Sequence, residues 1–339
     1  MPDEVTTRAN GGRRAISVCI ATVRPSTIGT AIESIRRQTW RDWELLVVGQ
    51  GADPKVSAVA TKAANGDGRV RYLDISKRGL SAARNAGLAA ARNEIVAMMD
   101  DDCEARPDWL AALVQCFEEK PETGLVGGSF LAGPPSWRTR STCLSLVATE
   151  AFYDPASAPP PPGFEWFGAN FAVRRSVAEL VGPFDEFFGA GATFRSCEDV
   201  DYKLRLEAAG VKMWSTPRSV VFHTYGRRYG ARAVVRYWDG HGLGAGAIAA
   251  KLTLVGDPRG RDSLRRAARE YTVGSLQRRS PHEILRNAVR LQSFLRGYGW
   301  CLRDFEVDGR GLLVPRRRAS ANGSWDAAGS ASRQEDRQR

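Results

Sequence analysis

The sequence has no apolar run long enough to cross a bilayer. Its longest candidate, Gly242 to Ala250, is rich in glycine and alanine and is ended by Lys251, far short of the roughly 20 residues that a spanning helix needs. The first thirteen residues are polar and lack the apolar core of a signal peptide. We therefore expect the protein to be made and kept in the cytoplasm.

Cysteine pairs at metal-binding spacing are also absent. The six cysteines show no CxxC pattern and are scattered through a sequence of ordinary composition, with 43% hydrophobic and 26% charged residues. Neither a zinc site nor a disulfide framework is indicated, so we expect reduced thiols. The sequence contains no recognised nucleic-acid motif, and we expect no nucleic-acid partner.

Acidic residues are scarce in the C-terminal third. Residues 227–339 hold 23 Lys and Arg against 11 Asp and Glu, whereas the first 226 residues hold 26 against 27. The net charge of +11 therefore resides in the C-terminal third. A basic region of this kind is either a solvated face or a surface that meets an anionic partner, such as the inner face of a membrane, and the sequence leaves both open.

Short apolar runs alternate with segments of helical spacing over the first 130 residues. Such alternation is typical of a mostly parallel sheet with helices on both faces. After it, residues 133–163 contain two proline clusters and are expected to form a long loop, either a lid or an exposed linker. We predict strands at 16–20, 44–48, 70–73, 95–99 and 125–130, with helices at 26–38, 54–63 and 81–91.

Three consecutive aspartates, Asp100 to Asp102, follow the fourth predicted strand. Adjacent carboxylates repel one another unless a cation shares the space. Ligands of open α/β sheets bind beyond the carboxyl ends of their strands. Hard oxygen donors in a short loop suit Mg2+ or Mn2+, and Mg2+ usually takes one or two carboxylates together with substrate phosphates. The triplet therefore predicts a divalent metal site, with helix capping by one aspartate as the alternative.

A second acidic cluster, Glu198-Asp199, opens a predicted helix. The first turn of a helix favours ionised carboxylates, so by position alone both residues are more typical of caps than of catalytic bases. The helix is expected to bury one edge, formed by Val200, Leu204 and Ala208, and to pair Asp201 with Arg205 on an exposed turn.

Six motifs occur in order along the first two thirds of the chain. They are residues 17–22, Gln38-Thr39 before 43–48, 83–87, the triplet 100–102, 182–186 and Glu198-Asp199. Together they resemble the family 2 inverting glycosyltransferases, which are nucleotide-sugar enzymes of the GT-A fold. The resemblance runs from about residue 16 to His223, with further likeness over 237–257. It implies a GT-A type, Rossmann-like, mostly parallel sheet flanked by helices, with a helical C-terminal extension.

The resemblance also implies roles for individual residues. Asp199 matches the catalytic base, which takes a proton from the acceptor hydroxyl, and Glu198 is expected to orient the acceptor or to cap the helix. Asp100 and Asp102 match the aspartates that hold the ribose and a divalent cation, Mn2+ or Mg2+, and His223 matches a further metal or phosphate ligand. The residues expected to contact the donor nucleotide are Thr22, Arg24, Gln50, Arg84, Asp100 and Asp101.

Two positions depart from the family pattern. Gly49-Gln50-Gly51 stands where many relatives have Asp-Asp-Gly-Ser, so base recognition must differ, and the Gln50 amide is able to pair with a uracil or thymine edge. Val23-Arg24-Pro25 replaces the Tyr-Asn-Arg of many relatives, so Arg24 is expected to take over a phosphate contact.

The chain is expected to divide into a disordered N-terminus (1–13), a glycosyltransferase domain (14–226), a helical basic extension (227–315) and a disordered tail (316–339). The extension contains a helix with an apolar stripe, which is more typical of packing against the protein's own domain than of a membrane. Arginines beside the stripe leave peripheral attachment to an anionic membrane open. The stripe comprises Ile284, Leu285, Ala288, Leu291 and Leu295.

The leading interpretation is metal-dependent, inverting transfer of a hexosyl or deoxyhexosyl group from a nucleoside-diphosphate sugar to a glycan or lipid-linked acceptor, in cell-surface polysaccharide biosynthesis. One alternative is a sugar-phosphate nucleotidyltransferase, but residues 21–26 lack the glycine-rich loop that such enzymes place after the first strand. The other is a non-catalytic module that binds a nucleotide sugar or an anionic polymer, against which the intact Asp100, Asp102 and Asp199 argue. The sugar, the linkage and the oligomeric state stay open.

Overall fold

The computed structural model describes residues 15–133, 145–224, 230–273 and 281–316. Its first four strands form a parallel half-sheet in the order β3-β2-β1-β4. These strands are β1 (Ile16–Thr22), β2 (Trp43–Gln50), β3 (Val70–Ile75) and β4 (Ile95–Asp100). Every residue of β1 and β2 is buried, as expected for strands covered on both faces. The four strands predicted in this region are confirmed, each slightly longer than expected.

The other half of the sheet is mixed. Strand β8 pairs antiparallel with β4, and β6 and β9 continue the sheet beyond it as far as β5, while β7 pairs with β9. β7 falls within the long loop predicted over 133–163. Part of this segment packs down on the sheet, since Phe152 contacts Trp214 and Tyr153 contacts Phe164. The bounds are β5 (Glu104–Ala105), β6 (Leu125–Ala132), β7 (Ala151–Tyr153), β8 (Asn170–Arg174) and β9 (Met213–His223).

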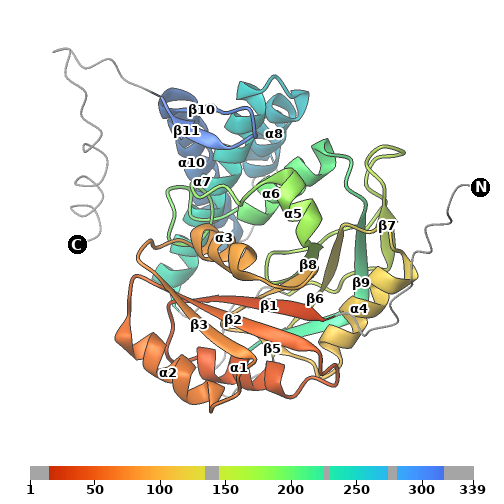
Figure 1. Cartoon of the computed structure of the whole chain (residues 1–339). Coiled ribbons are helices and arrows are strands. Elements are labelled where there is room, and N and C mark those ends of the chain that lie inside the picture. Colours follow the sequence, from red (N-terminus) through yellow and green to blue (C-terminus); the bar gives the residue numbers. More distant parts are fainter. Residues whose placement is uncertain (1–14, 134–144, 225–229, 274–280, 317–339) are drawn as a thin grey trace, which may run out of the picture.

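Helices cover both faces of this sheet (Figure 1), which gives three layers and confirms the predicted α/β class. On one face lie α1 (Ile28–Arg36), α2 (Pro54–Ala64) and α4 (Trp109–Glu119). On the other lie α3 (Leu80–Ala90), α5 (Arg175–Val181) and α6 (Glu198–Ala208).

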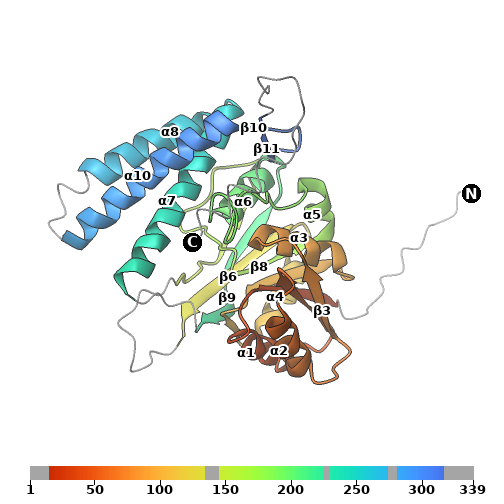
Figure 2. The ribbon, with the colours of Figure 1, turned by 90° about the vertical axis from the view of Figure 1, so that its left-hand side faces the viewer.

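Three further helices lie beyond the α3, α5 and α6 layer (Figure 2). They are α7 (Ala231–Leu254), α8 (Pro258–Ala268), which η1 (Arg269–Val273) continues, and α10 (Pro281–Asp304). A hairpin of β10 (Phe305–Val307) and β11 (Leu313–Pro315) follows. Glycine lets α7 and α10 approach closely, since a Cβ on Gly246 would lie 2.0 Å from the carbonyl oxygen of Phe294. No helix among the described residues is long and apolar enough to cross a membrane.

The C-terminal helices share a hydrophobic core with the loop that leads into α6. Phe188 and Phe194 of this loop are buried together with Leu243 and Ala247 of α7 and Cys301 of α10. The loop also lies close against α7, because a Cβ on Gly244 would meet the Ser196 hydroxyl at 2.4 Å. The extension therefore supports the loop that carries the second acidic cluster.

The apolar stripe predicted on α10 faces solvent, contrary to the expectation that it packs against its own domain. Ile284, Leu285 and Leu295 are 46%, 53% and 51% exposed, and only Leu291 packs against a core cluster. The reason is that α10 uses its opposite face, which carries small side chains, to approach α7. That buried face comprises Asn287, Ser293, Phe294, Gly297 and Cys301.

Some expectations fall on residues that the structure does not describe. The predicted disordered N-terminus and residues 317–339 of the predicted tail lie outside the described ranges. So do Arg278 and Arg279, two of the arginines expected beside the apolar stripe.

Candidate active site

The carboxyl ends of the parallel strands bring the predicted residues to one edge of the sheet. Thr22 ends β1, Gln50 ends β2 and Asp100 ends β4, and these strands are parallel neighbours. The site is completed by His223 at the end of β9 and by the first turn of α6. Residues distant in sequence therefore meet where open α/β sheets bind ligands.

Thr22 and Arg24 hold two of the three aspartates. The Thr22 hydroxyl donates to Asp101 Oδ2 at 2.7 Å, and the Arg24 guanidinium lies 3.4 Å from Asp101 Oδ1 and donates to Asp102 Oδ2. Burial raises the pKa of Asp101 to about 6, against the opposing effect of Arg24. Burial acts in the same direction on Asp102, yet its hydrogen bond with His223 and the charge of Arg24 bring its pKa below the usual range.

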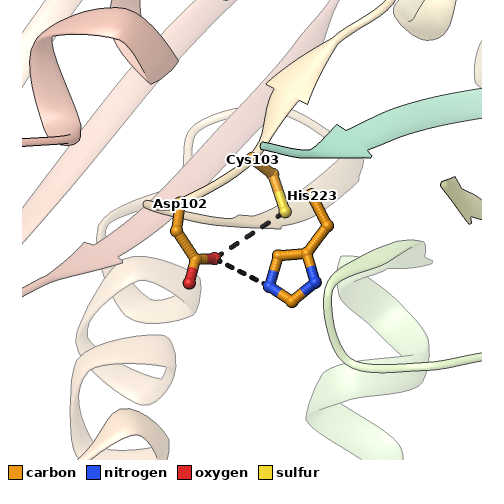
Figure 3. A group of neighbouring side chains, drawn as sticks. All are labelled: Asp102, Cys103 and His223. Atoms are coloured by element: carbon orange, nitrogen blue, oxygen red, sulfur yellow. Dashed lines mark hydrogen bonds and ion pairs between the residues drawn. The ribbon is translucent and has the colours of Figure 1, made fainter. Parts of the chain in front are cut away.

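His223 and Cys103 complete a cluster around Asp102 (Figure 3). His223 Nε2 lies 3.4 Å from Asp102 Oδ1, and the Cys103 thiol donates to the same oxygen at 3.9 Å. All three residues are buried, and their potential ligand atoms lie within 4.8 Å of one another. Sequence reasoning proposed Asp102 and His223 but not Cys103, because the direction of its thiol depends on the turn that follows β4.

Arg84, buried on α3, joins the triplet to the second acidic cluster. Its guanidinium lies 2.9 Å from Glu198 Oε1 and 3.2 Å from Asp100 Oδ1, and it donates to the carbonyl of Gly168 at 2.7 Å. These partners compensate a charge that is only 3% exposed and would otherwise be costly to bury. Asp100 is more open than the other two aspartates, at 32% exposed. A contact of Arg84 with the nucleotide stays a prediction.

Glu198 and Asp199 share a helical turn but lie in different environments. The backbone N–H of Gly168 donates to Asp199 Oδ2 at 3.0 Å, and that of Val200 donates to Oδ1 at 2.8 Å. Gly168 is therefore held from both sides, by Asp199 through its N–H and by Arg84 through its carbonyl. Glu198 is buried, and its burial together with the charge of Asp199 raises its pKa to about 7. The half-buried Asp199 is the more accessible of the two carboxylates.

Comparison with known proteins agrees with this geometry. Residues 17–181 match the model of glycosyl transferase family 2. This chain carries a family 2 glycosyltransferase domain. The resemblance inferred from the six motifs is confirmed.

Relatives and a solved structure are also similar. The chain is 31% identical over 181 residues to the glucosyl-dolichyl phosphate glucuronosyltransferase of Haloferax volcanii, covering 50% of this chain and 56% of that protein. It is 36% identical over 201 residues to the uncharacterized glycosyltransferase EpsJ of Bacillus subtilis, covering 55% and 54%. The chain thus spans about half the length of these relatives.

The fold is similar to that of the mannosyltransferase PcManGT from Pyrobaculum calidifontis, solved in complex with GDP-Man and Mn2+. The TM-score is 0.58 at 15% identity, and the likeness covers 86% of this chain and 88% of that one. The family 2 domain has the GT-A fold, as predicted.

Gln50 is already engaged within the family 2 domain. Its side-chain oxygen accepts a hydrogen bond of 2.8 Å from the backbone N–H of Gly79, the residue before α3. Gly79 has a φ of 138°, a conformation that favours glycine. The contact of Gln50 with the nucleobase stays a prediction. Of the two polar groups of its amide, the NH2 is the one that has no partner among the described residues.

Helix α6 is confirmed, but its buried face differs from the predicted one. Val200 is 43% exposed and Ala208 is exposed, whereas Tyr202 and Leu206 are fully buried. Asp201 and Arg205 do pair, at 2.9 Å, but the pair is buried and not on an exposed turn. Apolar periodicity failed here because the buried face of α6 carries charged side chains with partners on other elements.

Lys251 supplies one of those partners, and sequence reasoning missed it. Its ammonium lies 2.8 Å from Asp185 Oδ2 and pairs also with Asp201. Asp185 accepts a further hydrogen bond of 2.8 Å from the backbone N–H of Leu313 in β11. One buried cation of α7 thus joins α6, the loop after α5 and the C-terminal hairpin, and nothing in the local sequence distinguishes this lysine from a surface residue.

Proposed function

We propose that this protein is an inverting glycosyltransferase, which moves a sugar from a nucleoside-diphosphate sugar to a hydroxyl group of a glycan or lipid-linked acceptor. The observation that carries the proposal is the junction of two acidic clusters through Arg84 at one edge of the sheet. Inversion needs a base on one side of the sugar and a stabilised leaving group on the other. The two clusters offer separate groups for these tasks.

Asp199 is the group best suited to act as the base. It is half-buried, and two backbone N–H groups orient its carboxylate. As the acceptor oxygen forms its bond to the anomeric carbon, Asp199 takes the hydroxyl proton, and the bond from that carbon to the diphosphate breaks with its electron pair on the diphosphate. Glu198, paired with Arg84, holds the guanidinium in place and is less able to react.

The donor atoms around the triplet fit a divalent cation. Asp102 and His223 provide an oxygen and a nitrogen in the same buried cluster, and Asp100 provides a more open carboxylate. We infer that these three residues hold Mn2+ or Mg2+, both of which suit carboxylate oxygens. When bound, such a cation neutralises the charge of the departing diphosphate. The Mn2+ and GDP-Man bound by PcManGT support this assignment.

The nucleotide would lie beside Thr22, Arg24 and Asp101. The Arg24 side chain is 43% exposed although it pairs with the triplet, so it is free to turn toward a phosphate when a donor enters. Asp101 is buried and bonded to Thr22, which suits a role in shaping the donor side of the site.

The acceptor is proposed to belong to cell-surface polysaccharide biosynthesis. The name of the Haloferax relative includes a dolichyl phosphate, which supports a lipid-linked acceptor. In that case the protein would work in the cytoplasm at the inner face of the membrane, which its basic C-terminal third would meet.

A panel of nucleotide sugars tests the proposal by thermal shift with and without Mn2+. A donor that binds only the folded state raises the free energy of unfolding, by about 2.7 kcal/mol at a concentration of 100 Kd, and therefore raises Tm. We expect one or a few nucleoside-diphosphate sugars to raise Tm only in the presence of Mn2+. Asp102→Ala should lose the Mn2+-dependent part of the Tm increase, whereas the control Asp262→Ala, at an exposed position on α8, should retain it. Stabilisation by none of the donors would contradict the proposal.

A further inference from the structure

Helix α10 presents an apolar face that no described residue covers. Ile284, Leu285 and Leu295 are 46%, 53% and 51% exposed, and Ala288 is exposed as well. At 100° per residue, Ile284, Ala288 and Leu295 fall within one narrow sector of the helix, and Leu285 lies at its margin. The face runs along three turns, which distinguishes it from the scattered exposed apolar residues of an ordinary surface.

Exposed arginines also lie on the neighbouring helix α8 and at its junction with η1. Arg261, Arg266 and Arg269 are exposed, and no carboxylate of the described residues pairs with them. Residues 258–273 and 281–304 together hold nine arginines against four acidic residues. Leu264 of α8 and Leu291 of α10 pack in the same cluster, so the two helices are direct neighbours. Figure 2 shows both on the far side of α7 from the sheet.

We propose that the outer face of α8 and α10 docks onto an anionic lipid bilayer. An amphipathic helix lying in the headgroup boundary buries its apolar face there, and arginines beside it meet the lipid phosphates. A second copy of the chain fits this face less well, because a two-fold contact would bring the same unpaired arginines against each other. Docking would bring the active site to a lipid-linked acceptor, and this role rests on the proposed function. The docking itself does not depend on that function.

Flotation of the full chain with lipid vesicles tests the docking. We expect the protein to float at low salt with vesicles that contain phosphatidylglycerol and not with vesicles of phosphatidylcholine alone. Raising the salt to about 0.5 M shortens the Debye length to a few ångströms and should release most of the protein. No flotation with anionic vesicles at low salt would overturn the proposal.

Two variants separate the contributions of the apolar face and the arginines. Leu285→Ser with Leu295→Ser should lower the vesicle affinity by a factor on the order of 100, because each leucine adds several buried carbons. The control is Val147→Ser with Leu180→Ser, which removes two side chains that are 71% and 69% exposed outside these helices and should leave the affinity unchanged.

The charge variant replaces Arg261, Arg266 and Arg269 with Gln. Each arginine at an anionic surface contributes a factor of about five, so a loss on the order of 100-fold is expected. Its control replaces Arg37, Arg41 and Arg92, which are exposed in the catalytic domain, and changes the net charge equally. Equal losses in the test and control variants would mean that net charge alone attracts the protein, and the docking face would be rejected.

Two further measurements separate other outcomes. Light scattering after size exclusion reports the mass in solution, and a dimer that the leucine variant abolishes, without vesicle binding by the wild type, would assign the face to a second copy. Hydrolysis of the nucleotide sugar without vesicles reports the catalytic site alone. Vesicle binding without any donor hydrolysis would reject the proposed function and leave the docking intact.

Discussion

Two adjacent carboxylates show how a single residue's surroundings decide its role. Glu198 is enclosed, faces Arg84 at 2.9 Å and has a pKa raised to about 7 by burial and by the charge of Asp199. Asp199 is partly exposed to solvent, and two backbone N–H groups orient its carboxylate. The sequence placed both residues in the first turn of one helix, but it could not distinguish their environments, because these come from α3 and from the segment before β8.

Replacement of Glu198 by Gln should change how the transfer rate depends on pH. In the wild type, ionisation of Glu198 near pH 7 completes its pair with Arg84, which holds Gly168 and, through the Gly168 N–H, the Asp199 carboxylate in position. We therefore expect kcat/KM to rise through about pH 7 in the wild type and to lose that rise in Glu198→Gln. Profiles of kcat/KM over about pH 5.5 to 8.5 measure this, and an unchanged inflection in the variant would assign it to another group.

At the scale of elements, α6 is fixed by the ion pairs of Lys251. Lys251→Met leaves Asp185 and Asp201 buried without their shared cation, and breaking a buried pair typically costs about 3–5 kcal/mol. We expect a loss of that size in the free energy of unfolding by urea at neutral pH. Asp185→Asn in the same chain should recover part of it, since Asn keeps an acceptor for the N–H of Leu313.

The stability of Lys251→Met should also depend on pH. Burial already raises the pKa of Asp185, and removing the opposing lysine raises it further. The native state then holds a proton that the unfolded chain releases above about pH 4, so stability falls as the pH rises through this window. The difference from wild type should be larger at pH 7.5 than at about pH 5. A difference that does not change with pH would show that the lysine acts only through packing.

The crossing of α7 and α10 depends on the absence of side chains at particular glycines. Gly246→Ala would place a Cβ 2.0 Å from the carbonyl oxygen of Phe294, so the helices must separate. Overpacking of this kind costs about 1–3 kcal/mol. Gly299→Ala, on the same helix pair, meets nothing within 4 Å and should stabilise α10 by up to about 1 kcal/mol. Thermal unfolding of both variants tests this explanation. Equal changes in Tm for Gly246→Ala and Gly299→Ala would contradict it.

Sequence patterns predicted elements well where the pattern was apolar and local. The parallel strands were found because they are continuous buried runs, and the Asp100 to Asp102 triplet was found because it ends one of them. The short strands β5 and β7 were missed, since their positions depend on pairing with β9. The buried face of α6 was predicted wrongly because Glu198 and Asp201 share it with Tyr202 and Leu206. The stripe of α10 was predicted wrongly because that helix packs through small residues instead.

At the scale of the whole molecule, the basic C-terminal third both supports and extends the catalytic domain. Its α7 shares a core with the loop before α6. Its outer helices carry an exposed apolar face and arginines that pair with no carboxylate in the part of the chain that the structure describes. A change in the extension can therefore act on the site through α6 as well as on attachment to a surface. Transfer to a soluble acceptor should fall in Lys251→Met but not in the charge variant of α8, and steady-state rates without vesicles distinguish these effects.

The most direct test of the account is the Asp199→Asn variant. Asn keeps the shape and can accept one of the two backbone hydrogen bonds but loses the basicity, so donor binding by calorimetry in Mn2+ should match the wild type. Transfer to the acceptor should fall by a factor on the order of 100 to 10,000. The control Asp262→Asn, on exposed α8, should be unaffected. Near-normal turnover by Asp199→Asn with intact donor binding would remove Asp199 from the mechanism and contradict the central claim.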